Sequence, residues 1–217
     1  MMNSSERLIE GLVDDLTPVR PIPRLRSAFA VILALWAALL GVVLFSSSKG
    51  LASGALLHDQ VYLASFMGLG LAAVGGALSA LAAGVPGRER LEIVGLGTAC
   101  LGLMAAAIAC LYGLQQPPLE TSAPAGLDAI CFRHGVILSL LPAGVILGFL
   151  VRGWTARPFR AVAVALAGSG ALGAVIVHLG CGFVGPRHLL VGHLSVPIVL
   201  ALLGLYPLAV IVRRLRG

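Results

Sequence analysis

The chain has very few charged residues for its length. Only 11% of its 217 residues are Asp, Glu, Lys or Arg, whereas 59% are hydrophobic, and the mean hydropathy is +1.01. Soluble domains contain about 25% charged residues, so this composition excludes an ordinary soluble protein. The formal net charge of +6 comes from basic residues that flank apolar runs. We therefore expect no direct contact with nucleic acid.

The residues Asp, Glu, Lys and Arg are almost absent from six long apolar runs of 17–23 residues. A helix rises about 1.5 Å per residue, so each run is long enough to cross the ~30 Å hydrocarbon core of a bilayer. Glu92, at the start of the third run, is the one Asp, Glu, Lys or Arg inside them. The runs are Ala28–Phe45, Val61–Ala83, Leu91–Gly113, Gly135–Val151, Ala161–Leu179 and Leu189–Ile211. The predicted fold class is an all-α integral membrane protein with six transmembrane helices.

The sequence also lacks the motifs of several membrane-protein classes. It has no Cys-x-x-Cys pair of the kind that disulfide oxidoreductases use, and no Ser/His/Asp or paired-carboxylate constellation, so we predict that the protein is not an enzyme. The apolar runs carry no ionisable path, which disfavours a transporter of metal ions or small molecules. That class is kept as the alternative. A haem protein also stays open, because His178 and His193 could face each other near one membrane boundary.

Lys and Arg are scarce on one side of the predicted membrane fold. Twelve of the fifteen fall on the other side, in the N-terminal segment, the second and fourth loops and the tail: Arg7, Arg20, Arg24, Arg26, Arg88, Arg90, Arg152, Arg157, Arg160, Arg213, Arg214 and Arg216. Only Lys49, Arg133 and Arg187 break this pattern. Cytoplasmic loops carry the excess of basic residues, so both termini are predicted to be cytoplasmic. The predicted parts are a cytoplasmic N-terminal effector (1–27), a transmembrane sensor (28–211) and a basic tail (212–217).

The N-terminal segment is predicted to form a short amphipathic helix. Its apolar stripe recurs at helical spacing and consists of Leu8, Ile9, Leu12, Val13 and Leu16. Its acidic residues are Glu6, Glu10, Asp14 and Asp15. Helices that lie on membranes usually carry Lys and Arg on the polar face, and short helices need a surface on which to bury their apolar stripe. The pattern favours docking in a partner protein with a basic rim. Packing on the protein's own loops is the alternative.

All five histidines are predicted on the outer side, together with two cysteines. His58 lies in the first outer loop, and His134 follows Cys131 at the start of the fourth span. The candidate sensing cluster consists of Cys131, Cys181, His178, His188 and His193. His178 and Cys181 are three residues apart, a spacing that suits a soft or borderline divalent metal ion. A disulfide between Cys131 and Cys181 is the other possibility. Cys110 is close to the outer end of its span, and Cys100 is expected only to pack.

Three stretches of the chain resemble the NrsF family. They are the segment from Leu8 to Pro21, Cys131-Phe132-Arg133 followed by the run Leu138–Ala143, and His178-Leu179-Gly180-Cys181 followed by Arg187, His188 and His193. The resemblance implies a six-span anti-sigma factor of the bacterial inner membrane. Its N-terminal segment would hold an extracytoplasmic-function (ECF) sigma factor away from RNA polymerase. The cysteines at 131 and 181 would take part in sensing an envelope signal such as metal, oxidant or light-generated singlet oxygen.

Overall fold

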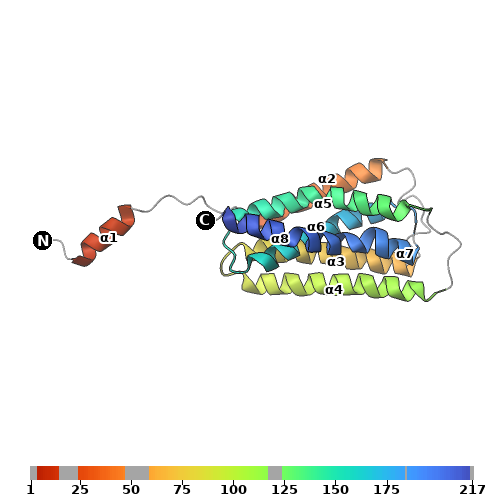
Figure 1. Ribbon diagram of the computed structural model, residues 1–217, viewed down its shortest axis with the longest axis horizontal. Coiled ribbons are helices and arrows are strands. Elements are labelled where there is room, and N and C mark those ends of the chain that lie inside the picture. Colours follow the sequence, from red (N-terminus) through yellow and green to blue (C-terminus); the bar gives the residue numbers. More distant parts are fainter. Residues whose placement is uncertain (1–3, 15–23, 47–58, 117–123, 184, 216–217) are drawn as a thin grey trace.

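The computed structural model describes residues 4–14, 24–46, 59–116, 124–183 and 185–215, and these residues form no strand. The helices are α1 (Ser4–Asp14), α2 (Leu25–Ser46), α3 (Gln60–Ala83), α4 (Glu89–Leu114), α5 (Leu127–Arg152), α6 (Pro158–Gly180), α7 (Pro186–His188), the π-helical segment η2 (Leu189–Leu194) and α8 (Ser195–Arg214). Six of the helical stretches are long and apolar enough to cross a membrane, with α7, η2 and α8 forming the last of them. They lie side by side in one elongated bundle (Figure 1). The prediction of six spanning helices is confirmed.

The helix bounds agree with the apolar runs except at the start of the fourth. The apolar run begins at Gly135, whereas α5 begins at Leu127, eight residues earlier. Asp128, Arg133 and His134 interrupt the hydropathy of this stretch but not its helical backbone. The consequence is that Cys131 sits within the second turn of a helix, which fixes the direction of its side chain.

Helix α6 lies at the centre of the bundle. In its most apolar stretch 83% of the residues are buried, compared with 6% in α2. It packs against α2, α3, α5 and α8. Large apolar side chains on the peripheral helices are exposed, among them Leu101 and Ile108 on α4 and Leu202 and Leu203 on α8. Such a distribution is expected where the outer surface faces lipid.

Helices α3 and α4 approach each other through small residues. A Cβ added to Gly102 would lie 2.5 Å from the backbone nitrogen of Ala72, and one added to Gly75 would lie 2.6 Å from that of Ala99. Real Cβ atoms do not come this close to backbone atoms, so glycine is required at both positions. Small residues at such spacing let helix backbones pack closely in lipid.

This close packing predicts that Gly102→Ala destabilises the bundle. The added methyl group meets backbone on α3, which cannot move aside, so we expect a loss of about 1–3 kcal/mol. The unfolding midpoint of the detergent-solubilised protein measures the effect. Gly97→Ala is the matched control, because a Cβ at Gly97 meets nothing within 4 Å. Equal midpoints for the two variants would contradict the packing described.

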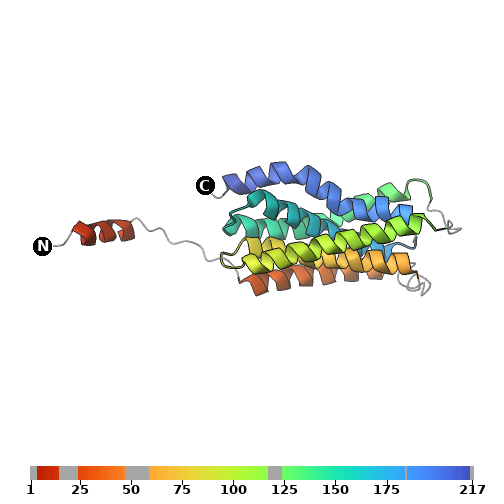
Figure 2. The same ribbon diagram turned by 90° about the horizontal axis from the view of Figure 1, so that it is seen from below.

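The two ends of the bundle differ in charge. Helix α2 begins and α8 ends at the same end of the bundle (Figure 2). The arginines described at this end are Arg24, Arg26, Arg88, Arg90, Arg152, Arg157, Arg160, Arg213 and Arg214. Arg160 on α6 forms an ion pair with Glu92 on α4. The opposite end carries Arg133 and Arg187 among the described residues. The predicted sorting of basic residues is therefore seen in space.

Helix α1 confirms the predicted N-terminal helix. Its apolar side chains Ile9, Leu12 and Val13 are 60%, 61% and 57% exposed, and Glu6, Glu10 and Asp14 are exposed on its other faces. Figure 1 shows α1 apart from the bundle. Asp15 and Leu16 lie outside the described residues, as does the side chain of Leu8. The described part of the apolar stripe is thus not buried against the protein itself.

Candidate metal centre

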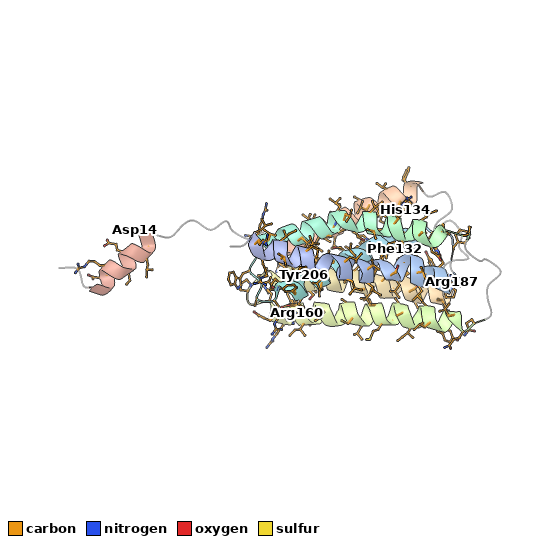
Figure 3. All side chains as sticks on the ribbon, viewed as in Figure 1. Asp14, Phe132, His134, Arg160, Arg187 and Tyr206 are labelled. Carbon is orange, nitrogen blue, oxygen red and sulfur yellow. The ribbon has the colours of Figure 1, made fainter. Side chains whose placement is uncertain are left out.

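Four of the predicted sensing residues meet in one buried cluster. Cys131 comes from α5, Cys181 follows the end of α6, His188 closes α7 and His193 lies in η2. Each residue offers one ligand atom, and the four atoms lie within 4.8 Å of one another. His134 and Arg187 mark the same end of the bundle, opposite to Arg160 (Figure 3). The cluster therefore lies opposite to the arginine-rich end of the bundle, where α2 begins and α8 ends.

The two cysteines are close neighbours but are not linked. Their Sγ atoms are 3.8 Å apart, and both thiols are free. A disulfide requires a separation of about 2.05 Å, so the Cys131–Cys181 disulfide, one of the two possibilities drawn from the sequence, is not present in this structure. Each cysteine is 7% exposed, and Val177, Leu127 and other apolar residues surround the pair. Two buried thiols at this distance can either bind one ion together or form a disulfide after a small movement.

The ring of His188 is oriented by a carboxylate. Its Nδ1 lies 2.6 Å from Oδ1 of Asp128, to which it must donate because a carboxylate oxygen accepts. A neutral His188 then has its lone pair on Nε2, which lies 3.3 Å from the Cys181 sulfur. A carboxylate behind a histidine is the usual support of a metal ligand. His188 is therefore held ready to bind an ion through Nε2.

His193 is oriented in the same way by a second histidine. Nε2 of His178 lies 3.2 Å from the backbone oxygen of Tyr62 and donates to it, so Nδ1 of a neutral His178 must accept. That acceptor lies 3.1 Å from Nδ1 of His193, which therefore donates. The lone pair of His193 is left on Nε2, a buried atom with no hydrogen-bond partner among the described residues. Both histidines of the cluster thus present an unprotonated Nε2.

The π-helical segment explains how His188 and His193 come together. In an α-helix, residues five apart point about 140° away from each other. In a π-helix the backbone hydrogen bond joins residues i and i+5, so they lie on the same side. The His188 and His193 ring centroids are 5.1 Å apart. Isolated π-helical turns often occur at functional sites, and here one aligns two candidate metal-binding histidines.

The pKa of the Cys181 thiol is lowered by its surroundings. The largest cause is the hydrogen bond with Cys131, and contacts with His188 and His193 act in the same direction, whereas burial opposes them. The thiolate is the form of cysteine that binds metals and reacts with oxidants. Cys181 is thus the sulfur of the pair better suited to carry the negative charge.

The other histidines and cysteines considered from the sequence do not belong to the four-residue cluster. His178 is not among the four clustered residues but lies behind His193, with its ring stacked on Tyr62 at a centroid distance of 4.2 Å. His134 is exposed and donates to the backbone of its own helix, and His58 lies outside the described residues. Cys110 is buried and Cys100 exposed, both away from the cluster.

Asp128 and Tyr62 belong to the site but were not predicted from the sequence. Asp128 could have been recognised, since it precedes Cys131 by three residues and so shares a helix face with it. Tyr62 contributes a backbone oxygen to His178, and its hydroxyl donates to the backbone oxygen of His178 at 3.0 Å. Backbone contacts of this kind leave no signal in the sequence.

A family model described as NrsF, negative regulator of sigma F, matches residues 12–214. The chain belongs to the NrsF family. The NrsF match includes all six spanning helices and the four cluster residues, and it begins within α1. No curated protein and no solved structure matches the chain significantly.

Proposed function

We propose that this NrsF-family protein is an anti-sigma factor of the bacterial inner membrane. It holds an ECF sigma factor at the cytoplasmic face and releases it on an envelope signal, and it has no catalytic activity. The observation that carries the proposal is the family match over nearly the whole chain. The proposed parts are the effector (1–27), the six-helix sensor (28–211) and the basic tail (212–217). Both termini face the cytoplasm, as the arginines at that end of the bundle favour.

The effector is helix α1. Its exposed side chains Ile9, Leu12 and Val13 form an apolar surface with carboxylates beside it. A sigma factor binds DNA and therefore carries basic surfaces, which complement Glu6 and Glu10. An amphipathic helix binding in a groove of its partner is a common mode of recognition. In the bound state this groove would be unavailable to RNA polymerase.

The sensor is the Cys131–Cys181 pair with its two histidines. A soft metal ion would bind to the sulfur and nitrogen atoms together. A two-electron oxidant, or singlet oxygen, would act on the same thiols, and disulfide formation would shorten the sulfur–sulfur distance from 3.8 Å to about 2.05 Å. Each signal therefore changes the relative positions of α5 and the α6–α7 connection.

The signal must cross the membrane to reach α1. Helix α6 has 23 residues, so it spans about 34 Å at 1.5 Å per residue. It is the most buried helix and contacts α2, which follows the effector. To change the bound fraction of sigma factor from 99% to 1% the signal must favour release by about 5.5 kcal/mol. Disulfide formation or metal binding supplies free energy of this order.

Co-purification tests the proposal. The full-length protein is expressed in a bacterium with candidate ECF sigma factors, extracted in mild detergent without added metal or oxidant, and purified. We expect one sigma factor to remain bound through purification. A folded, membrane-inserted protein that retains none of them would contradict the proposal. A transporter of metal ions would then be tested by uptake into vesicles.

A further inference from the structure

We propose that Cys131, Cys181, His188 and His193 bind one tetrahedral divalent ion of the zinc class. With Zn–S distances of about 2.3 Å and tetrahedral angles, two sulfur ligands lie about 3.8 Å apart, and a sulfur and a nitrogen about 3.5 Å apart. The structure has 3.8 Å between the two Sγ atoms and 3.3 Å between the Cys181 sulfur and Nε2 of His188. Two sulfur and two nitrogen ligands in this arrangement are typical of zinc sites.

The protonation pattern of the histidines fits this ion. Asp128 and His178 accept the Nδ1 protons of His188 and His193, so that both Nε2 atoms are free to bind. Nε2 of His193 is buried without a partner among the described residues. A buried polar atom without a hydrogen bond is costly. Binding of an ion would satisfy this nitrogen.

The charges of the site also fit a divalent cation. Two thiolates and two neutral imidazoles carry a charge of −2, which a divalent ion neutralises in a largely water-free environment. Arg133 and Arg187, the basic residues described at this end, are exposed, and within the described ranges no arginine bonds to either sulfur. Uncompensated charge is very costly in the low-dielectric interior of a protein.

The ion would connect three spans of the sensor. Its ligands lie on α5, in the α6–α7 connection, on α7 and in η2, so binding ties the fourth, fifth and sixth spans together at one end. If the proposed function holds, binding of the ion is the event that alters the packing of these spans and weakens retention of the sigma factor. This last step rests on the proposed function, whereas the ion site does not.

Cobalt(II) titration of the purified full-length protein in detergent tests the site. Cobalt(II) in a tetrahedral site with sulfur ligands gives intense visible bands and sulfur-to-metal charge-transfer absorption. We expect saturation at one ion per chain and bleaching on addition of zinc. Cys131→Ser and His188→Ala should abolish these bands. His134→Ala is the matched control and should keep them, because His134 is an exposed histidine on the same helix as Cys131.

The Asp128→Asn variant tests whether ion binding can be weakened while the protein remains folded. The asparagine retains the shape of the side chain but accepts more weakly from His188, so we expect cobalt affinity to fall 10–100-fold with the helix content unchanged. Weak octahedral-type spectra, or equal binding by the wild type, Cys131→Ser and His188→Ala, would overturn the site. Because no sigma factor is present, that result would leave the anti-sigma proposal standing. Tight cobalt binding by a protein that retains no sigma factor would support the metal site but not the anti-sigma proposal.

Discussion

Replacing Ile9 and Leu12 together by glutamate should abolish retention of the sigma factor. These side chains are 60% and 61% exposed in the free protein, so burying them in a partner is favourable, by about 1.5–3 kcal/mol each. Losing both contributions corresponds to a roughly 10²–10⁴-fold weaker complex. Burial of the introduced carboxylates adds a further cost. We therefore expect constitutive transcription from sigma-dependent promoters.

The dissociation constant of detergent-solubilised full-length protein for the sigma factor measures this effect directly. Arg7→Glu is the matched control, because it changes the net charge by the same two units on the opposite side of α1. It should leave the complex within a few fold of the wild type. Both variants should insert in the membrane normally, since the substitutions lie outside the bundle. Unchanged affinity of the Ile9→Glu, Leu12→Glu variant would show that α1 is not the effector.

Cys131→Ser should produce the opposite phenotype, in which the sigma factor is held but no longer released. Serine is a poor ligand for soft metal ions and cannot form a disulfide, while it is close to cysteine in size. Cys131 lies on α5 three residues before His134, which Figure 3 shows at the end of the bundle opposite to Arg160, so the resting complex should be unaffected. Induction by cadmium or peroxide should then fall to the level of untreated cells. Cys181→Ser should behave in the same way.

A reporter driven by a sigma-dependent promoter, with and without the inducer, measures this loss. Cys100→Ser is the matched control, because Cys100 is an exposed cysteine on α4 outside the cluster. It should respond as the wild type does. A Cys131→Ser, Cys181→Ser double variant that still responds would exclude both residues from sensing. Retention of the sigma factor in untreated cells distinguishes a lost response from a misfolded protein.

The six spanning helices could be predicted because lipid imposes a simple rule. An uninterrupted apolar run of about 20 residues must satisfy its backbone internally, and a helix does so. The rule fails at α5, which begins at Leu127. Asp128, Arg133 and His134 are polar residues within the first turns of this helix, so they mark the start of its apolar stretch and not the start of the helix. Hydropathy records where a helix enters the apolar region, whereas helix bounds depend on backbone hydrogen bonds. The crossing of α3 and α4 at Gly75 and Gly102 likewise depends on tertiary packing.

The cluster could be predicted only in part. Its residues share one end of the bundle because each lies near a span boundary, which the sequence reveals. The sequence could not predict which ring nitrogen of each histidine is free to bind an ion and which donates a hydrogen bond. This assignment follows from the hydrogen-bond chain Tyr62–His178–His193, which joins three helical segments. The sequence predicts that His178 binds an ion together with Cys181, whereas in the structure it lies behind His193 and contacts its Nδ1. The π-helical segment that aligns His188 with His193 has no clear sequence signal.

The most direct test of signal-dependent release is the fraction of sigma factor bound to the full-length protein before and after the signal. Membranes are treated with cadmium or peroxide, the tagged protein is purified, and bound sigma factor is quantified. We expect nearly complete binding before treatment and loss of most of the sigma factor afterwards. In the Cys131→Ser, Cys181→Ser variant the treatment should have no effect. The proposed release would be contradicted if the sigma factor never binds. It would also be contradicted if treatment removes the sigma factor equally from the wild type and from this variant.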